Sequence, residues 1–166
     1  MAYPHRAFIS IGSNLGDKLD NCLRGIDALT AAGDIRIRRR SAMYRTEPVD
    51  FKDQDWFVNC VILVETGLDP LGLLERLQSV QRQAGRPVER LRFGPRVLDL
   101  DLLLYDGVIL EDPRLTLPHP RLHRRRFVLK PLCDIDPDTV HPVLNQTAQA
   151  LLAELEEEGQ QVVELE

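Results

Sequence analysis

The sequence predicts an α+β protein with a mainly antiparallel sheet, and three observations favour this class. Apolar segments of strand length and amphipathic segments of helix length follow one another in the order βαββαββ, with further helices after them. Residues 35–44 begin by alternating isoleucine with arginine, which is typical of a strand with one wet face. The length of 166 residues fits one domain with a sizeable core, so we expect a single domain over residues 1–166.

The first elements follow from local patterns. Residues 7–11 are an apolar run that predicts a buried strand, and the turn-forming residues at 12–17 predict a loop after it. Leucine and isoleucine recur at helical spacing over residues 18–31, which predicts a helix. After the strand over 35–44, residues 46–55 contain a proline, several acids and no periodicity. This loop is long for a compact domain, and such loops are often functional.

The middle of the chain predicts a central strand and a second helix. Residues 56–66 are apolar at odd and even positions alike, so this strand should be buried on both faces. Pro70 suits the first turn of a helix, and the apolar spacing continues to about residue 84. Residues 85–96 form a second long loop, which is rich in arginine and contains two prolines. A strand over 97–105 follows it directly.

The last part of the chain combines a turn with short helices. Asp106-Gly107 is a hairpin-type turn, after which residues 108–109 should begin a returning strand. Thr147 is a suitable N-cap for an apolar helical stripe. We expect helices over 124–133 and 147–158 and an edge strand over 161–165.

Composition excludes several classes of protein. With 43% hydrophobic and 28% charged residues, the chain is neither disordered nor fibrous. No apolar run approaches the roughly 20 residues that span a bilayer, and the first residues lack an apolar signal region, so we expect a cytoplasmic protein without a membrane partner. A net charge of −5 disfavours binding to nucleic acid. The widely spaced Cys22, Cys60 and Cys133 are interpreted as buried free thiols.

Arginine is concentrated in one region of this acidic chain. Ten of the 18 arginines lie between Arg82 and Arg126. The guanidinium group offers a planar fork of donors that matches phosphate oxygens, so the cluster indicates a small phosphorylated ligand. A solvated face with internal ion pairs would give the same count, and the composition leaves both interpretations open.

The strongest chemical signal is the pair Asp99 and Asp101 within the predicted strand 97–105. The leucines at alternate positions from Leu98 to Leu104 should form one apolar face on the core side, which leaves both aspartates on the other face. Their Cα atoms would lie roughly 6.6 Å apart. Two carboxylates this close repel each other unless a cation lies between them, and Mg²⁺ commonly uses one or two carboxylates plus substrate phosphates. The alternative is a pair that simply marks the wet face of the strand.

Three further features lie outside that strand. Arg86 and Arg96 flank the loop that leads into it, where cations beside a carboxylate-bound metal would suit a polyphosphate. His119 is held between two prolines, as a positioned ligand requires, although a lone histidine is more often structural. Asn59 is one amide in an apolar strand and could read the edge of a heterocycle on which Phe57 stacks. Core packing and a local hydrogen bond explain that last pair equally well.

Five segments together carry a resemblance to a known family. They are residues 9–15 (ISIGSNL), 44–48 (YRTEP), 57–59 (FVN), 92–101 (RFGPRVLDLD) and 115–119 (LTLPH). In this order they resemble 6-hydroxymethyl-7,8-dihydropterin pyrophosphokinase, a folate-pathway family, from about Phe8 to Pro137. The resemblance implies transfer of the β,γ-pyrophosphoryl group of ATP to the hydroxymethyl group of the pterin, with release of AMP. It also implies an α/β sandwich with a ferredoxin-like core that is usually monomeric.

The resemblance also implies roles for individual residues. Asp99 and Asp101 would hold two Mg²⁺ ions and, with Arg86 and Arg96, are the expected catalytic residues. The nucleotide side would comprise Gln78, Arg86, Arg96, Leu102, Arg114, Thr116, His119 and Arg125. The pterin side would comprise Gly12, Thr46, Pro48, Val49, Phe57, Asn59, Phe93 and Phe127. The chain departs from the usual family pattern at Gln81, Glu89 and Phe93, where the family often has glutamate, a basic residue and tryptophan.

Two other functions compete with this interpretation, and a third is weaker. One is a different Mg²⁺-dependent phosphotransferase with another hydroxyl acceptor, in which Asn59 would read no pterin edge. Another is a non-catalytic nucleotide-binding module, which would bind ATP without forming AMP. The third is RNA binding through the arginine-rich loop, which would need stacking aromatic residues on an exposed sheet, and only 5% of the residues are aromatic.

Overall fold

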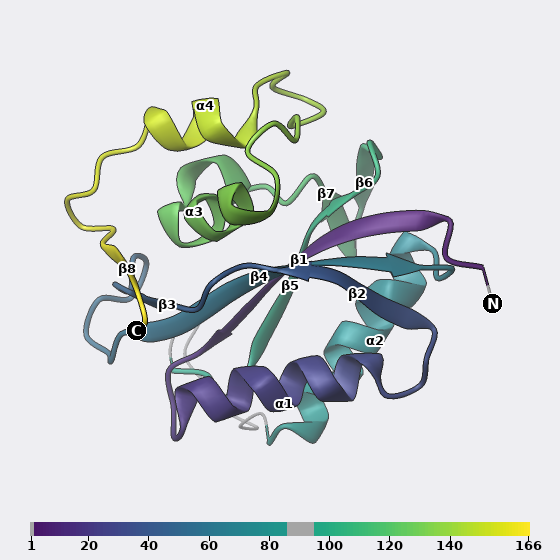
Figure 1. Ribbon diagram of the computed structural model, residues 1–166, viewed down its shortest axis with the longest axis horizontal. Helices are drawn as coiled ribbons and strands as arrows, with labels where there is room; N and C mark the ends of the chain where they lie inside the picture. The colour runs from purple at the N-terminus through teal and green to yellow at the C-terminus, as the bar shows by residue number, and fades with distance from the viewer. Residues whose placement is uncertain (1, 86–94) are drawn as a thin grey trace.

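The structure, a computed structural model that describes residues 2–85 and 95–166, is built around one antiparallel sheet (Figure 1). The strands of this sheet are β1 (His5–Ser13), β2 (Ile35–Arg40), β3 (Tyr44–Thr46), β4 (Phe57–Thr66), β5 (Asp99–Tyr105) and β8 (Val162–Glu164). The helices are α1 (Lys18–Thr30), α2 (Pro70–Gln83), α3 (Arg126–Ile135) and α4 (Ala148–Ala153). A separate hairpin consists of β6 (Leu110–Asp112) and β7 (Leu115–Leu117), and a short 3-10 turn covers Leu122–Arg124.

The strand order confirms the predicted fold class. The sheet runs β5-β1-β4-β3-β8, and β2 pairs with β4 alongside β3. All of its neighbouring strands are antiparallel. With α1 following β1 and α2 following β4, the segment from β1 to β5 is a ferredoxin-like βαββαβ core. The expected edge strand near residues 161–165 is present as β8, which pairs with β3.

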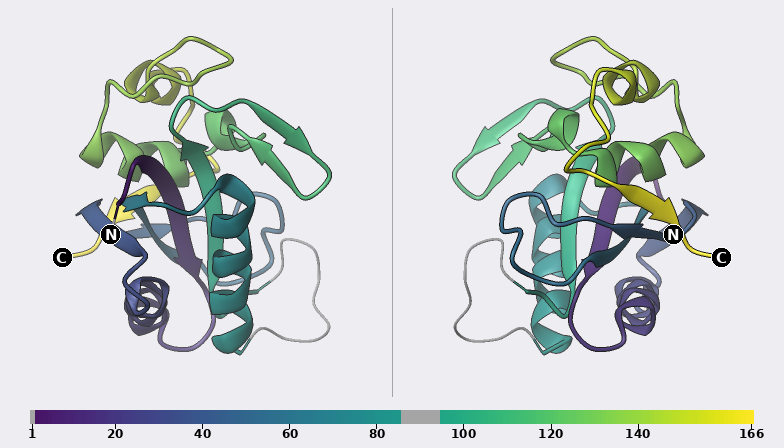
Figure 2. Two further views of the ribbon diagram at one scale, coloured as in Figure 1. Left: turned by 90° about the vertical axis from the view of Figure 1, so that its right-hand side faces the viewer. Right: turned by 90° about the vertical axis from the view of Figure 1, so that its left-hand side faces the viewer.

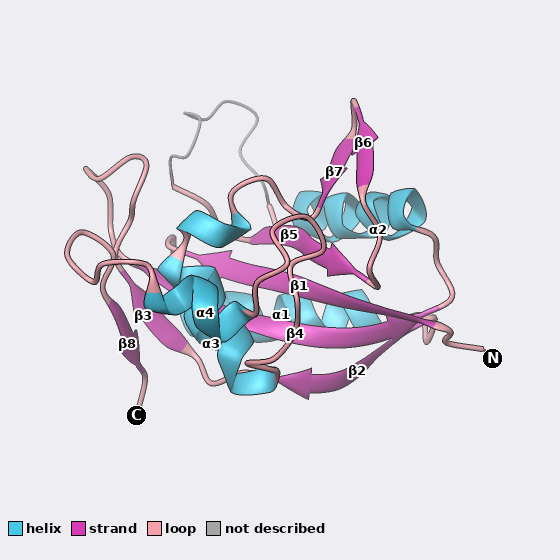
Figure 3. Ribbon diagram, turned by 90° about the horizontal axis from the view of Figure 1, so that it is seen from above, coloured by secondary structure: helices cyan, strands magenta, loops and turns pink. Residues whose placement is uncertain are grey.

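Both faces of the sheet are buried, so the molecule is a three-layer sandwich. Figure 1 shows α1 and α2 on one side of the sheet and α3 and α4 on the other, and Figure 3 shows α3 and α4 lying across it. Ile9 and Ile62 pack into the cluster with α1 and α2, whereas their chain neighbours Phe8 and Val61 pack into the cluster with α3 and α4. Alternate side chains on a strand point to opposite faces, so central strands buried on both sides must be apolar throughout.

The helix starts follow from local capping. Asp17 accepts a hydrogen bond from the backbone N–H of Asp20 (3.1 Å) at the start of α1. Asp69 caps α2 in the same way, with Pro70 at the first helical turn. Thr147 caps α4 as predicted, but that helix ends at Ala153 rather than near residue 158.

The predicted strand over 35–44 is wrong in its continuity, because the chain breaks there into β2 and β3. Ser41 lies at the break, where its backbone N–H donates to Val61 O and its hydroxyl accepts from the Val61 N–H, each at 2.9 Å. A side-chain oxygen thus replaces the strand's own acceptor for one residue. A bulge between Ile37 and Arg39 further disturbs the register with β4.

The predicted apolar face of β5 is correct only as far as Leu102. Ile9 pairs with Leu102 and Phe8 pairs with Leu104, so Leu103 is an extra residue in a β-bulge. Beyond it the alternation changes phase, and Leu104 packs with Leu103 against α3 instead of joining Leu102 in the other cluster. The sequence pattern could not show this, because every residue from Leu102 to Leu104 is apolar.

The predicted returning strand at 108–109 is also wrong. Asp106 does form a turn, with φ of 48°, and Val108 N–H donates to Tyr105 O. The chain then leaves β5, and β6 pairs with β7 instead. Figure 2 shows this hairpin extending beyond the main sheet. The predicted helix over 124–133 begins later and is α3, preceded by the 3-10 turn.

Among the described residues, no helix combines the length and the apolar character that crossing a bilayer demands.

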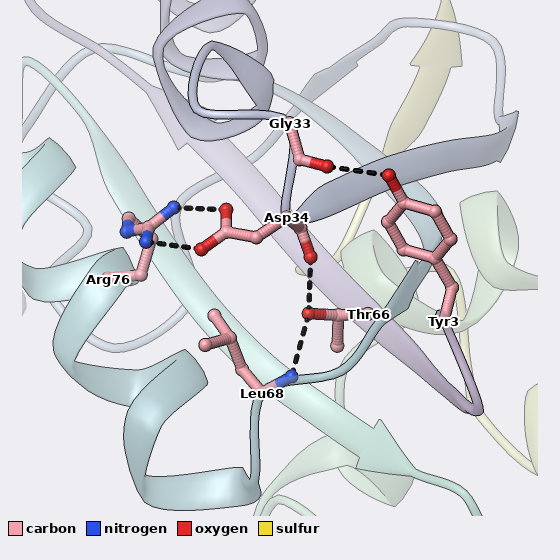
Figure 4. A network of polar contacts seen from close by, with 6 residues as sticks. All are labelled: Tyr3, Gly33, Asp34, Thr66, Leu68 and Arg76. Atoms are coloured by element: carbon pink, nitrogen blue, oxygen red, sulfur yellow. Dashed lines mark hydrogen bonds and ion pairs between the residues drawn. The ribbon is translucent and has the colours of Figure 1, made fainter. Parts of the chain in front are cut away.

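A polar network ties the turn after α1 to α2 and to the end of β4 (Figure 4). The Asp34 carboxylate accepts two hydrogen bonds from the Arg76 guanidinium, each at 2.7 Å. Thr66 Oγ1 donates to Asp34 O and accepts from Leu68 N–H. A bidentate pair of this kind holds α2 against the turn between α1 and β2.

We expect Asp34→Asn to lower the free energy of unfolding by about 1–2 kcal/mol at pH 7, because one charged bidentate pair is lost. The Arg76 hydrogen bond lowers the pKa of Asp34 below its ordinary value of 3.8. A lowered carboxyl pKa stabilises the fold above the ordinary value, and this stabilisation is lost as the pH falls through the folded value. Urea unfolding at pH 7 and pH 3 should therefore show a smaller difference from the wild type at pH 3. Asp27→Asn, exposed on α1, is the matched control, and an equal loss there would contradict the role of Asp34.

Candidate active site

A cavity of about 460 Å³ lies on the sheet face that α3 covers, next to the start of that helix. This volume is typical of small-molecule sites. Most of the site residues predicted from the sequence line it: Gly12, Thr46, Pro48, Val49, Phe57, Asn59, Gln78, Arg96, Asp99, Asp101, His119, Arg125 and Phe127. These residues come from β1, β3, β4, β5, α2, α3 and the loops between them, so the fold brings together segments that are distant in the sequence.

The neighbours of Gly12 in the sheet explain why glycine is required at this position. Gly12 on β1 lies between Asn59 on β4 and Asp99 on β5. A Cβ atom at Gly12 would overlap Asn59 Oδ1, so only glycine leaves room for that amide over the strand. The buried Asn59 amide donates to Thr46 Oγ1 on β3. The nitrogen end of the Asn59 amide is thereby fixed, and Asn59 lines the cavity.

Asp99 and Asp101 lie on one face of β5, as predicted. Their partners across the ladder, Gly12 and Ser10, also line the cavity. Both aspartates are partly exposed, whereas Leu98 and Leu100 are buried on the other face. Carboxylate oxygens are the donors that Mg²⁺ prefers. The described residues gather no cluster of three or more potential protein ligands, and Mg²⁺ needs none because it retains water and binds substrate phosphates. The pair therefore fits the ion.

Arg96 lies beside this pair at the entry to β5. Its Nε is 3.5 Å from Asp99 Oδ1, and the side chain is buried. The backbone holds it in place, because Arg96 N–H donates to Asn14 Oδ1 (2.7 Å) and Asn14 N–H donates to Arg96 O (2.9 Å). Asn14 Nδ2 also donates to Gln54 Oε1 and Asp55 O. One amide thus connects the loop after β1, the loop before β4 and the arginine.

Gln81 stabilises the outer edge of β5 at the aspartate pair. Its Oε1 accepts a hydrogen bond from the Leu100 N–H at 2.6 Å, and the residue is buried. Leu100 stands between Asp99 and Asp101 in the chain. The glutamine therefore satisfies a backbone donor that would otherwise lie on an unpaired strand edge and keeps the strand extended between the two carboxylates.

His119 is a neutral hydrogen-bond donor at the cavity. Its backbone N–H donates to Leu103 O, and its Nδ1 accepts from the Arg121 N–H at 3.1 Å. The ring proton of the neutral form is therefore on Nε2. Burial, with further contributions from Arg125 and Arg121, lowers the pKa of His119 to about 4. The ring therefore stays uncharged at neutral pH.

This lowered pKa predicts a pH dependence of stability. The unfolded chain binds a proton at His119 near the ordinary pKa of 6.5, whereas the folded chain binds it only near 4. The resulting stabilisation is complete above pH 6.5 and is lost as the pH falls towards 4. Between pH 7 and pH 4.5, the unfolding free energy should fall by about 2–3 kcal/mol less in His119→Gln than in the wild type, because the variant lacks this titrating group. Urea unfolding at pH 7, 5.5 and 4.5 measures it, and parallel curves for the two proteins would contradict the assignment.

Arg125 directly precedes α3 and lines the cavity. Its Nη2 is 3.5 Å from Asp50 Oδ2, and its guanidinium lies 5.3 Å from the centre of the Phe127 ring. Burial lowers the pKa of Arg125, while Asp101, Asp50 and Asp99 act against that shift. The Arg125 side chain is therefore largely buried, and the nearby carboxylates stabilise its positive charge.

Five of the predicted site residues are not among the described residues that line this cavity. Leu102 is in the core between the sheet and α1–α2. Arg114 is exposed at the turn of the β6–β7 hairpin, where it pairs with Asp112. Thr116 lines a second, smaller cavity beside that hairpin. Arg86 and Phe93, together with the departure at Glu89, lie outside the described residues. The roles of these residues remain predictions.

The cavity is also lined by residues for which the sequence predicts no site role, although Gln81 is a departure from the family pattern. They are Ser10, Glu47, Asp50, Gln54, Leu74, Gln81, Leu100, Pro120 and Arg121. Ser10 could have been found, because it is two residues before Gly12 on a strand and shares its face. Asp50 and Gln54 lie in a loop without periodicity, where no local pattern indicates which side chains point inward.

Comparison with known proteins identifies the family. The family model of 7,8-dihydro-6-hydroxymethylpterin-pyrophosphokinase matches residues 8–137. A 2-amino-4-hydroxy-6-hydroxymethyldihydropteridine pyrophosphokinase of Methylorubrum extorquens is 44% identical over 96% of this chain and 99% of its own length. The same enzyme of Haemophilus influenzae is 39% identical over 82% of this chain and 84% of its own.

Longer relatives contain a similar segment. The folic acid synthesis protein fol1 of Schizosaccharomyces pombe is 40% identical over 92% of this chain, which spans 21% of that protein. A crystal structure of wild-type Plasmodium falciparum HPPK-DHPS with pteroate has the same fold, with a TM-score of 0.71 and 15% identity, over 90% of this chain and 42% of that one. The chain belongs to the 7,8-dihydro-6-hydroxymethylpterin-pyrophosphokinase family, and its activity is pyrophosphoryl transfer from ATP to hydroxymethyldihydropterin in folate biosynthesis.

Proposed function

We propose that this chain performs the transfer at the cavity over β1, β4 and β5, with Asp99 and Asp101 as the metal-binding catalytic residues. One observation supports this most directly. The two carboxylates share one face of β5 in the cavity, with the buried Arg96 guanidinium beside Asp99. Carboxylates and a buried cation in one pocket are the groups that bind a metal-bound polyphosphate and neutralise charge as a phosphoryl group moves.

Two Mg²⁺ ions are the proposed metal complement. Asp99 and Asp101 would hold them, and the phosphates of ATP would complete their coordination. When bound, the ions supply a Lewis acid and a template that bring the acceptor hydroxyl and the β-phosphorus together. Gln81 keeps the strand between the two carboxylates extended through its bond to Leu100 N–H. The protein's own contribution to this step is the fixed spacing of its ligands.

The acceptor is proposed to bind at the β3–β4 end of the cavity. Asn59, held by Thr46, would read the polar edge of the pterin ring, and Gly12 leaves room for that amide. Phe57 and Phe127 line the same cavity and would stack on the two faces of the ring. Pro48 and Val49 would close the apolar side.

The nucleotide is proposed to bind towards α2 and the start of α3. Gln78, His119 and Arg125 line this part of the cavity. Arg125 offers a charged fork to the phosphates, and the neutral His119 offers an Nε2 donor. Arg96 and Arg86 would grip the phosphates, while Phe93 would lie near the pterin. Leu102, Arg114 and Thr116 would also belong to the nucleotide side.

The chemistry requires positioning more than a protein nucleophile. The acceptor hydroxyl loses its proton, which is released to solvent over the reaction. Its oxygen bonds to the β-phosphorus as the bond from that phosphorus to the α–β bridging oxygen breaks, and AMP leaves with the bridging oxygen. Arg96 and Arg125 would stabilise the charge that shifts onto the phosphate oxygens. Residues 46–55 would exclude water, which is a competing acceptor.

We further propose that residues 1–166 act as one catalytic domain, as a monomer in the cytoplasm, without a nucleic-acid or membrane partner. Two features support the single domain and the absence of nucleic acid. The two apolar clusters share one sheet, and the net charge of −5 disfavours polyanions.

Phosphorus NMR of the purified protein tests the reaction. With Mg-ATP and 6-hydroxymethyl-7,8-dihydropterin, we expect AMP and a pterin diphosphate ester, and with the pterin left out we expect ATP to persist. Formation of ADP would mean attack at the γ-phosphorus and would contradict the proposal. Intact ATP in the presence of the pterin would favour a different acceptor or a site that only binds nucleotide.

A further inference from the structure

An ion pair joins the two proposed substrate subsites. Asp50 lies in the loop between β3 and β4, directly after the pterin-side residues Pro48 and Val49. Its carboxylate is 3.5 Å from the guanidinium of Arg125, which belongs to the proposed nucleotide side. Asp50 and Arg125 both line the main cavity. The contact therefore links a residue of one subsite to a residue of the other across 75 positions of sequence.

The two partners differ in how firmly they are held. The Arg125 side chain is only 12% exposed and lies over the Phe127 ring, so its position is restricted. The Asp50 side chain is 39% exposed, and its single contact to Arg125 is at the long limit of a hydrogen bond. An ion pair of this geometry is weak and can exchange one partner. Asp50 is therefore the less buried partner, and a competing anion at Arg125 would displace it rather than the guanidinium.

We propose that Asp50 is a positioning residue that acts as the counter-ion of Arg125 until a nucleotide phosphate takes its place, and that it thereby limits nucleotide affinity. This inference rests on the proposed function of Arg125. A phosphate group that reaches Arg125 must replace the Asp50 carboxylate and then lies near that negative charge. Asp50 therefore weakens nucleotide binding in two ways, by competing for the guanidinium and by repelling the phosphate.

The test is isothermal titration of the full chain with the magnesium complex of α,β-methylene ATP, which cannot release AMP. We expect Asp50→Asn to bind this probe about three- to fivefold more tightly than the wild type, as the loss of one partly exposed ion pair allows. Asp50→Glu keeps the charge and should remain near the wild type. Asp53→Asn is the matched control, because it makes the same change at an exposed position of the same loop, outside the described lining of the cavity.

A second comparison shows whether Asp50 acts through Arg125. In an Arg125→Gln background, adding Asp50→Asn should change the probe's dissociation constant by much less than it does in the wild type. Pterin binding in the presence of the probe should be unchanged by Asp50→Asn if Asp50 is a counter-ion. The inference would be overturned if the dissociation constant of the probe were unchanged or higher in Asp50→Asn, or if pterin binding weakened. Asp50 would then serve to stabilise the loop. A wild-type chain that binds no probe would instead overturn the proposed function.

Discussion

Asp101→Asn and Asp99→Asn should each lower kcat by on the order of 10³-fold while the fold stays intact. Each change removes one of the two carboxylates that we assign to Mg²⁺, and a catalytic metal supplies several kcal/mol of transition-state stabilisation. The fold should survive because β5 pairs with β1 through its backbone, and both side chains point into the cavity, not the core. Initial rates of AMP formation at saturating substrates measure the effect.

The control for this prediction shows whether the effect depends on where the carboxylate lies and not only on the loss of one negative charge. Asp138→Asn removes a carboxylate from an exposed turn and should keep wild-type turnover. Near-ultraviolet circular dichroism should be unchanged in all three variants. The concentration of Mg²⁺ that gives half-maximal activity should rise in the β5 variants and stay constant in Asp138→Asn. Turnover close to the wild type in either β5 variant would show that the metal assignment is wrong.

Arg96→Ala should reduce kcat/KM for ATP by the equivalent of about 2–4 kcal/mol, as the loss of other preorganised charge donors does. The structure makes this substitution a clean test. The hydrogen bonds that tie Arg96 to Asn14 use the backbone N–H and C=O of Arg96, so truncation of the side chain leaves them in place. What is removed is the guanidinium next to Asp99.

Comparison with Arg96→Lys distinguishes charge from geometry. Lysine keeps the positive charge but loses the planar fork, so we expect it to recover only part of the activity. Urea unfolding of both variants shows whether the buried side chain serves stability instead. If Arg96→Ala lowers the unfolding free energy but leaves kcat/KM unchanged, Arg96 is a structural residue. The predicted phosphate contact would then be wrong.

Much of the fold could be predicted because its signals are local. The helix expected over 18–31 is Lys18–Thr30, and its start depends on the Asp17 cap and on the spacing of nearby apolar residues. The strand over 56–66 is central, as its unbroken apolar run indicated. Two of the errors about strands come from distant partners. Ser41 breaks a strand because its hydroxyl reaches Val61, and the bulge at Leu103 depends on how β5 aligns with β1.

The features of the candidate site can likewise be separated into those that follow from local sequence and those that depend on distant partners. Period-two alternation placed Asp99 and Asp101 on one face of a strand, and the structure agrees, because that relation depends only on strand geometry. The need for glycine at position 12 could be explained only by the side chain of Asn59 on the neighbouring strand. The same holds for Gln81, whose role is visible only because α2 packs beside β5 and brings its amide to Leu100 N–H.

By itself, the sequence determined most of the helices and strands, which face of β5 carries carboxylates and, through its motifs, the family. These are relations between residues close in the chain, or patterns carried whole by a segment. The tertiary structure alone decided that Arg96 is fixed by Asn14, that His119 has a pKa of about 4, and that Asp50 faces Arg125. Each of these depends on burial or on a partner from a distant part of the chain, and only packing brings such partners together.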